Sequence, residues 1–333
     1  MKWMHVRPAR GTDLPGLARL LPSLELEAAA IADDDGDDRL LLAFAGNGDE
    51  GATAPLGCIR LRRRIGLSQP RFWFHLGFRV HAAAELGMFR RERTLLLGND
   101  HTGAAELAEL CIDAARLQPA QRARLPRLLV RAALLLLQRD RQQLSAASAN
   151  IPRVIAALPG CRDDSGAAPF WEGLGRHFYP GNVDQAQARF GDRWRTHAAA
   201  LLPRHPVVVS VLQEAAQEAI GAVHPDAEHL RDALGECGLR AGQHVDLFDA
   251  GPVYESHLDL VDAHQPLQRC PLRLRAQLDR PVPLLIAGES ADEVWQVPGM
   301  VDSTGGVDLA SATAAQFGWV DAHPLWVSAR GDS

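Results

Sequence analysis

The sequence predicts a mixed α/β (α+β) fold, and three features near its start carry that expectation. Residues 2–7 alternate between polar and apolar types, as a strand does. Leucines then recur at helical spacing between residues 14 and 21, and the apolar segments 39–46 and 56–65 flank a turn rich in Gly, Asp and Asn. A strand, a helix and a strand pair in succession are typical of a sheet that packs against helices.

The middle of the chain continues this mixture. Residues 73–80 predict a strand, and 94–97 form a short apolar run that ends in a polar turn. Residues 105–113 fit a strand or a helix equally well by pattern alone. Residues 123–144 carry a broad leucine-rich face and predict a long helix, with Pro126 near its first turn, where proline is tolerated.

The second half alternates helices and strands before its character changes. Residues 207–219 and 227–236 predict helices, and 244–248 predict a strand that ends in a glycine turn. Beyond about residue 263, prolines punctuate short apolar segments, which indicates a small β-rich appendage. We therefore expect three parts: residues 1–145, 146–262 and 263–333.

Composition excludes several classes of function. The 333 residues carry a formal net charge of -6, so we expect neither nucleic acid nor a membrane as a partner. Five cysteines without metal-ligand or redox spacing indicate free thiols in a reducing compartment, and we expect no metal and no permanently bound cofactor. The longest apolar run, 132–137, cannot span a bilayer, and no signal-peptide stretch opens the chain, so we expect a cytoplasmic location.

Polar clusters at the ends of predicted strands are candidates for chemistry. The turn 98–103 contains Asn99, Asp100 and His101, which could face a cleft or simply form a well hydrogen-bonded turn. Asp249 lies next to a glycine turn, where it could hold a cationic substrate group or cap the turn.

His224 is the candidate for proton transfer, because an imidazole exchanges protons near neutral pH. Pro225 restricts its backbone to extended shapes. A histidine before a proline is more often structural, however, and His205-Pro206 has the same form.

Arginines gather in two runs, each of which fits either a solvated face or a docking surface for a ligand with several phosphates, such as coenzyme A. The runs are Arg60 with Arg62, Arg63 and Arg64, and Arg116 with Arg122, Arg124, Arg127 and Arg131.

Several separate segments together resemble arginine N-succinyltransferases. They include the motifs Asn-Asp-His-Thr-Gly, Pro-Phe-Trp and Val-His-Pro, and they follow that family's order over about 250 residues. The segments are residues 6–13, 81–86, 95–112, 165–178, 203–206, 213–225 and 245–252.

The resemblance implies a fold related to the GNAT superfamily of N-acetyltransferases, with a mixed sheet flanked by helices in one or two such halves and acyl-coenzyme A in a splayed cleft. It implies transfer of succinyl from succinyl-coenzyme A to the α-amino group of arginine or ornithine. Because some members act as paired, non-identical subunits, we expect a homo- or hetero-oligomer with a paralogue.

By the same resemblance His224 is the acid/base residue and Leu110 contacts the acyl-coenzyme A. Asn99, Asp100 and His101 fall in the substrate cleft by similarity of motif. The glycine loop that cradles the pyrophosphate in the family corresponds here to residues 117–127, which hold no glycine. Its arginines could pair with the phosphates instead: Arg122, Arg124 and Arg127.

Two alternatives follow from the missing glycines, and from Ala250, which stands where the family has the first glycine of Asp-Gly-Gly-Pro. The chain could be a catalytically impaired subunit that pairs with an intact paralogue. It could also be an acyltransferase of changed specificity.

Overall fold

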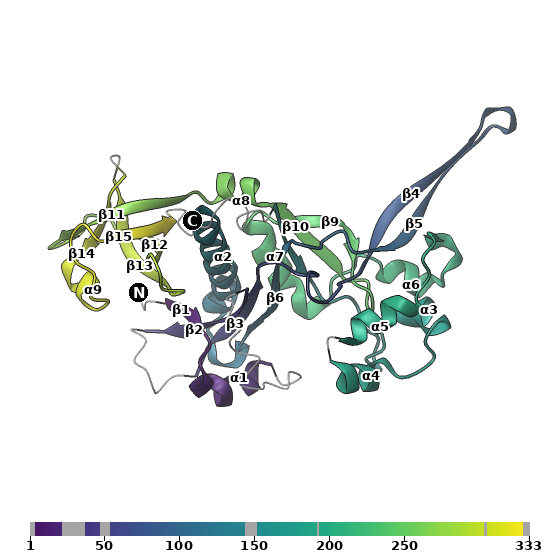
Figure 1. Cartoon of the computed structure of the whole chain (residues 1–333), viewed down its shortest axis with the longest axis horizontal. Helices are drawn as coiled ribbons and strands as arrows, with labels where there is room; N and C mark the ends of the chain where they lie inside the picture. Colours follow the sequence, from purple (N-terminus) through teal and green to yellow (C-terminus); the bar gives the residue numbers. More distant parts are fainter. Residues whose placement is uncertain are drawn as a thin grey trace.

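The computed structural model describes residues 4–21, 37–46, 54–143, 152–191, 193–302 and 305–328. Residues 2 and 3 of the first predicted strand, most of the turn at 46–54 and the predicted boundary between residues 145 and 146 lie outside this part. The molecule is elongated, with the β-rich C-terminal part at one end and a long hairpin at the other (Figure 1).

The centre of the molecule is a mixed sheet, which confirms the predicted fold class. Its strands follow the order β1-β2-β3-β6-β7-β10-β9, and β6 and β7 are the parallel pair among antiparallel neighbours. Both predicted halves contribute to this sheet, and the three-part division of the chain stays a prediction. The bounds are β1 (Met4–Pro8), β2 (Asp38–Ala45), β3 (Gly57–Arg62), β6 (Ala105–Ile112), β7 (Arg153–Ala157), β9 (Arg240–Val245) and β10 (Pro252–His257).

Helices cover both faces of the sheet because its strands alternate apolar side chains between them. Leu41 of β2 belongs to the core under α2 (Pro119–Gln143), whereas Leu40 and Leu42 pack against α1 (Leu14–Leu20). α7 (Glu228–Glu236) and α8 (Leu258–His264) share the α2 side. None of the described helices combines the length and apolarity that crossing a membrane requires.

The parallel pair requires a crossover, and α2 supplies it between β6 and β7. Every residue from 128 to 137 is buried or nearly so, since the sheet lies on one side of the helix and α7 and α8 lie on others. The helix begins at Pro119, earlier than predicted, so Pro126 lies in its interior and Pro119 takes the first position that suits proline.

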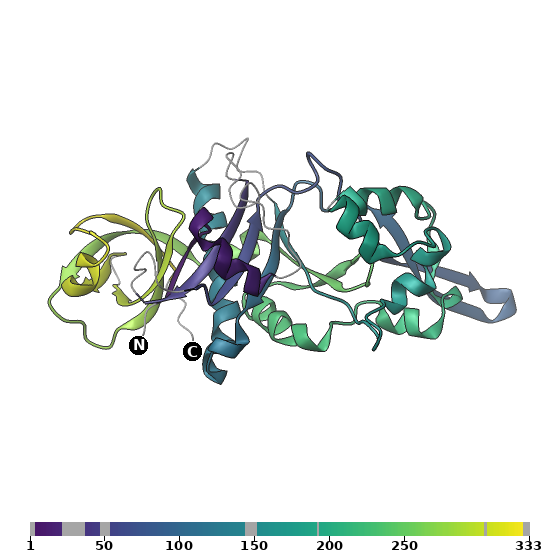
Figure 2. The ribbon, with the colours of Figure 1, turned by 90° about the horizontal axis from the view of Figure 1, so that it is seen from below.

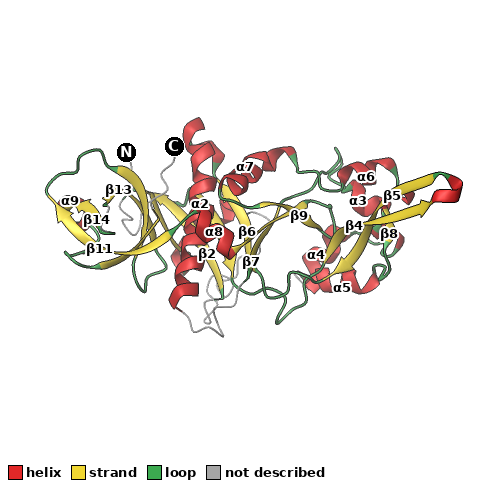
Figure 3. Ribbon diagram, turned by 90° about the horizontal axis from the view of Figure 1, so that it is seen from above, coloured by secondary structure: helices red, strands yellow, loops and turns green. Residues whose placement is uncertain are grey.

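Two insertions extend the sheet beyond β9. β4 (Trp73–Ala83) and β5 (Met88–Gly98) form the long hairpin, whose far end projects beyond the body (Figure 1). A group of short helices lies beside the base of this hairpin (Figure 3). The helices are α3 (Pro169–Gly173), α4 (Val183–Phe190), α5 (Arg193–Leu201) and α6 (Glu214–Ala219), and the short strand β8 (Val207–Val208) lies between α5 and α6 in the chain.

The C-terminal strands close into a small barrel, as the β-rich pattern predicted. They follow the order β12-β15-β11-β14-β13, and β12 also pairs with β13. β13 continues into the main sheet through β1, and the barrel forms one end of the molecule in Figure 2. The bounds are β11 (Leu267–Arg275), β12 (Val282–Ala287), β13 (Val294–Val301), β14 (Val307–Ala310), α9 (Ser311–Ala315) and β15 (Pro324–Ser328).

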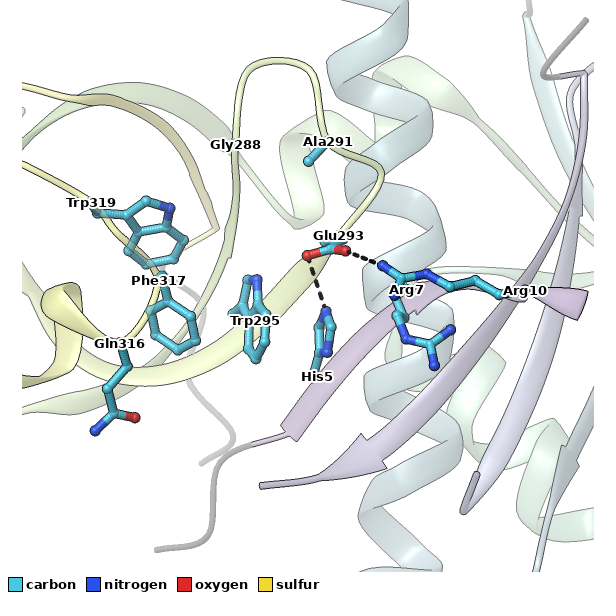
Figure 4. Close-up of a pocket in the computed structure, with 10 residues that line it drawn as sticks. All are labelled: His5, Arg7, Arg10, Gly288, Ala291, Glu293, Trp295, Gln316, Phe317 and Trp319. Carbon is cyan, nitrogen blue, oxygen red and sulfur yellow. Dashed lines mark hydrogen bonds and ion pairs between the residues drawn. The ribbon is translucent and has the colours of Figure 1, made fainter. Parts of the chain in front are cut away.

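A cavity of about 370 Å³ lies where the barrel meets β1 (Figure 4). His5 stacks on Trp295 with ring centroids 3.4 Å apart, and Glu293 faces both His5 and Arg10 at 3.4 and 3.3 Å. These contacts join the barrel to the sheet. β2 and β3 separate the cavity from β6.

Local patterns misassigned one segment and gave the wrong bounds for two strands. Residues 207–219 form β8, a short 3-10 turn and α6 rather than one helix. The run 94–97 is the end of an eleven-residue strand, β5. β9 ends at Val245, so the rest of the predicted strand 244–248 belongs to a turn. The segment 105–113, which fitted a strand or a helix by pattern, forms the strand β6.

Asp140 of α2 anchors a buried cluster of arginines. Its carboxylate accepts hydrogen bonds from Arg39 at 2.8 Å and from Arg139 at 3.0 Å, and Arg63 contacts it as well. Burial alone would raise the pKa of Asp140, but the three guanidinium groups outweigh it and hold the pKa below its ordinary value. The charge is therefore part of the packing between α2, β2 and the end of β3.

We expect Asp140→Asn to lower the free energy of unfolding by about 1–3 kcal/mol, because it removes the carboxylate that three buried guanidinium groups share and leaves them only Asp292 and Asp37. Since the folded pKa is depressed, the stabilisation is present at neutral pH and is lost as the pH falls through the folded pKa. Urea unfolding at pH 7 measures the effect. Asp259→Asn, at a position where the side chain is 88% exposed, is the control and should cost little.

Candidate functional site

β6 and β7 begin as a parallel pair and then part. Their recorded register joins Ala105 to Val154 and Glu106 to Ile155. Three residues further on, Glu109 adopts a positive φ of 51°, and the β3–β6 register shifts between Cys58 and Arg60. This bulge redirects β6, since an extra residue bends the strand that carries it.

A cavity of about 210 Å³ opens where the two strands part. Its walls are apolar, and α7 closes one side. The lining residues are Leu107, Ala108, Glu109, Leu110 and Cys111 of β6, Ala156 and Ala157 of β7 with the adjoining Leu158 and Pro159, and Leu230 and Leu234 of α7. The predicted contact residue Leu110 therefore lies in this cavity.

His224 lies next to the β7 end of the cavity. Its backbone N–H donates to the carbonyl of Pro159, a lining residue, at 2.9 Å. Its ring nitrogen Nδ1 accepts from the N–H of Asp226 at 3.2 Å. Because the turn holds the ring through Nδ1, Nε2 is the nitrogen placed to exchange a proton.

Asp249 belongs to a turn that crosses the same segment. A Cβ on Gly160 would lie 2.2 Å from the Asp249 carbonyl, and one on Gly251 would lie 2.0 Å from the Leu158 carbonyl. Ala250, which lies between Asp249 and Gly251 in the chain, has a positive φ of 55°, and glycine suits this position because it adopts such a backbone without strain. The turn also ties to the Val-His-Pro segment, because Gly221 N–H donates to the Ala250 carbonyl at 2.9 Å.

The carboxyl group of Asp249 titrates close to neutrality. Burial is the main cause and the nearby Asp246 charge adds to it, so the pKa of Asp249 rises to about 6. Hydrogen bonds from Gly251 and Gly160 and the charge of Arg162 oppose the shift without cancelling it.

A second polar cluster joins the turn before β6 to β9 and β10. Asp100 Oδ2 lies 3.0 Å from His244 Nε2, and the rings of His101 and His244 meet edge to face with centroids 4.2 Å apart. Glu255 completes the group, and Trp73 packs edge-on against His101. Burial, followed by neighbouring positive charge, lowers the pKa of His101 to about 4, so its ring is neutral at pH 7.

The arginines at the start of α2 differ in their contacts and exposure. Arg122 Nε donates to the Leu117 carbonyl at 3.0 Å, and Arg124 is exposed. Arg127 lies roughly two turns into the helix and forms an ion pair with Glu236 of α7. The Gln121 side chain accepts from the Gln118 N–H at 2.9 Å and so caps the first turn.

The structure divides the predicted site residues into three groups. Leu110, His224 and Asp249 gather around the parting of β6 and β7, Arg122, Arg124 and Arg127 lie along the start of α2, and Asn99, Asp100 and His101 lie in the turn before β6. His101 is only 1% exposed, and its place in the substrate cleft stays a prediction.

Sequence reasoning missed His244 and Glu255. Their partner His101 is more than a hundred positions away in the chain, and a histidine and a glutamate on separate strands give no local signal.

Comparison with known proteins identifies the family. The family described as "Arginine N-succinyltransferase beta subunit" matches residues 4–263. The chain belongs to this family. Its match covers the sheet, the cavity and the Val-His-Pro segment.

Relatives of this family match most of the chain. The arginine N-succinyltransferase of Yersinia pseudotuberculosis (strain YPIII) is 32% identical over 282 residues, which are 78% of this chain and 76% of the relative. That of Salmonella paratyphi B is 30% identical over 279 residues, 78% of this chain and 77% of the relative.

A solved structure shares the fold along the whole chain. It is subunit AI of the arginine/ornithine succinyltransferase from Pseudomonas aeruginosa. The TM-score is 0.76 at 21% identity, and the match covers 100% of both chains.

We expect Asp249→Asn to stabilise this family member above pH 6. The folded pKa is about 6 and the ordinary value is 3.8, so between these values the folded state binds more protons than the unfolded state. Stability therefore falls as the pH rises through this window, and removing the charge should recover about 1–3 kcal/mol at pH 8 and little at pH 4. Urea unfolding at the two pH values measures this.

The control is Asp279→Asn, at an exposed position. An Asp249→Asn variant that is destabilised equally at both pH values would contradict the elevated pKa.

Proposed function

We propose that this chain is an N-succinyltransferase that transfers succinyl from succinyl-coenzyme A to the α-amino group of arginine or ornithine. The observation that carries the proposal is the cavity between β6 and β7 with the Val-His-Pro histidine beside it. A thioester at the end of the cavity would reach a proton-exchanging group, which acyl transfer to an amine requires.

The pantetheine arm of the acyl donor would occupy the cavity. Past Glu106 the backbone groups of β6 that face β7 have no recorded ladder partner within the described residues, so they can hydrogen-bond the amides of the arm. Leu110 supplies apolar contact there. The nucleotide end would extend toward the start of α2, because a short 3-10 turn (Ala114–Arg116) and α2 follow β6 directly.

Guanidinium groups would replace glycine amides at the pyrophosphate. Arg122 and Arg124 lie in the first turns of α2, and charge-assisted hydrogen bonds from arginine suit phosphate oxygens. Arg127 would have to exchange Glu236 for a phosphate. The open cavity and its histidine favour an active enzyme over a catalytically impaired subunit.

In this reaction His224 would transfer a proton, and Asp249 would supply a negative charge that binds the acceptor. The ammonium must release one proton to solvent before the amine attacks the thioester carbonyl, and the attacking nitrogen loses a second proton as the amide bond forms and the C–S bond breaks. His224 Nε2, with Nδ1 held by the turn, would accept that second proton and donate it to the departing thiolate of coenzyme A. Asp249, ionised above pH 6, would hold a cationic group of the acceptor, and Asn99 and Asp100, in the turn before β6, would contact a different part of the acceptor.

We propose further that the chain forms a homo- or hetero-oligomer with a paralogue through the hairpin β4–β5. Large apolar side chains are exposed along it, which is unusual for a surface that stays in water. They include Phe78 (51%), Val80 (54%), Leu86 (77%) and Phe89 (74%).

Light scattering coupled to size exclusion should therefore report a mass above the 36.2 kDa of one chain. Replacing Leu86 and Phe89 by glutamate should reduce it to one chain, because a buried charge at an interface is costly. The control is Val320→Glu, at an exposed apolar position in the C-terminal part. A parent protein that elutes as a single chain at high concentration, both alone and mixed with its paralogue, would refute this assembly.

We expect Ala157→Leu to weaken coenzyme A binding at least tenfold, about 1.4 kcal/mol, by narrowing the opening between β6 and β7. Ala157 lines the cavity and is exposed, so a larger side chain there leaves the packed core alone. Titration calorimetry with coenzyme A measures the change. Ala241→Leu, at an exposed position on β9, is the matched control, and equal binding by the two variants would place the ligand elsewhere.

We expect His224→Gln to lower kcat by about 10²–10⁴-fold, with a much smaller change in the KM for succinyl-coenzyme A. Thiol release in the presence of arginine or ornithine measures the rate. His205→Ala is the control, since His205 is exposed and also precedes a proline. A His224→Gln enzyme that retained the full rate would eliminate the acid/base role.

A further inference from the structure

Three side chains from separate segments bring ligand atoms together beside β9 and β10. A ring nitrogen of His101, a ring nitrogen of His244 and a carboxylate oxygen of Glu255 all lie within 4.8 Å of one another. His101 lies in the turn before β6, whereas His244 and Glu255 lie on the paired strands β9 and β10. We propose that these three residues bind a divalent metal ion of the zinc class.

Burial of unsatisfied nitrogens is the first support. His101 is 1% exposed and His244 is 7% exposed. Within the described residues, neither ring nitrogen of His101 has a hydrogen-bond partner, and Nδ1 of His244 has none. Buried polar atoms without partners are costly and rare in folded proteins, so a cluster of three indicates that something else satisfies them.

The surroundings of the cluster are the second support. Asp100 Oδ2 lies 3.0 Å from His244 Nε2, which fixes the orientation of that ring and leaves Nδ1 as the nitrogen for a ligand. A carboxylate that holds the far nitrogen of a histidine is typical of metal-binding histidines. Gly242 leaves space for Glu255, since a Cβ there would lie 2.7 Å from the carboxylate oxygen Oε1.

The chemistry of the three ligands selects the ion. Two imidazoles and one carboxylate suit zinc and leave a fourth position for water. Arg153 donates to Glu255 Oε2 at 3.2 Å, so an incoming cation shares its carboxylate with a fixed positive charge. One carboxylate oxygen is too few for magnesium or calcium, which rely on oxygen ligands, whereas the two imidazoles suit an ion that binds nitrogen strongly.

The bound ion would join the end of the hairpin insertion to β9 and β10. This departs from the expectation of no metal, which rested on cysteine spacing and could not detect histidine and glutamate ligands from three separate segments. The inference is independent of the proposed transferase activity, because its test contains no substrate.

The test begins with the full chain freed of metal by a chelator and dialysed against zinc. Mass spectrometry of metal content should report one zinc per chain, and saturating zinc should raise Tm by about 5 °C. His101→Ala and Glu255→Gln should each weaken zinc binding at least tenfold. Cobalt in place of zinc should give visible absorption bands that both variants lose.

His205→Ala is the matched control, because it removes an exposed histidine outside the cluster and should bind zinc as the parent does. Glu255→Gln preserves side-chain shape, so its far-UV circular dichroism should match that of the parent even if His101→Ala fails to fold. No stoichiometric zinc in the folded parent, or parent-like zinc affinity in a folded Glu255→Gln, would overturn the proposal.

Discussion

The parting of β6 from β7 is the constraint on which the site depends. The two strands share ladder positions at Ala105–Val154 and Glu106–Ile155, and the left-handed backbone of Glu109 then turns β6 away. A non-glycine residue in that conformation costs roughly 1–3 kcal/mol. The Glu109 carboxylate is held by Arg60 at 2.7 Å and Arg62 at 3.2 Å, and these ion pairs fix the side chain of the strained residue.

That strain has a direct structural consequence. A parallel pair of strands that continued its ladder would satisfy its backbone groups internally and leave no room between the strands. Because β6 turns away, apolar walls face this space together with β6 backbone groups that have no β7 ladder partner in the part of the chain that the structure describes. A cavity of this kind suits a ligand that is an extended chain with amides, as pantetheine is.

Close backbone crossings hold the candidate catalytic groups beside that space. The segment after β7 passes so near the Asp249 turn that only glycine fits at Gly160 and Gly251. The Val-His-Pro segment attaches to both through backbone hydrogen bonds at Pro159 and Ala250. Backbone contacts restrict position more tightly than side-chain contacts do, so His224 and Asp249 are held by the fold rather than by each other.

Sequence patterns predicted the elements whose signals are local. The first helix, the strand pair β2–β3 and α7 follow from apolar spacing and turn residues, and α2 was placed but for its first turn. Residues 105–113 could not be decided, because both faces of β6 are buried near its start and no alternation remains to be read. The start of α2 was predicted too late because Pro126 was placed near the first turn. A proline is tolerated inside this helix because packing stabilises it.

The candidate site was predictable only where a motif kept its order in the chain. Leu110, His224 and Asp249 came from such motifs, and the structure gathers them around one cavity. His244 and Glu255 gave no signal, because their significance depends on a turn more than a hundred residues away. The burial of His101 could not be predicted from the sequence either, because a polar turn ordinarily lies at the surface.

β7 links the cavity to the histidine cluster. Its side chains alternate, so Ala156 lines the cavity while Ile155 faces the opposite side, where it packs in a cluster with Trp73. Glu255 pairs with Ile155 across the β7–β10 ladder, which extends over the whole of β7. β7 is therefore joined more extensively to β10 than to β6, and any widening of the cavity must separate β6 from β7 and β10 together. A contact that fastens the turn before β6 to β9 and β10, as the histidine cluster does, opposes that separation and so limits how far the cavity can open.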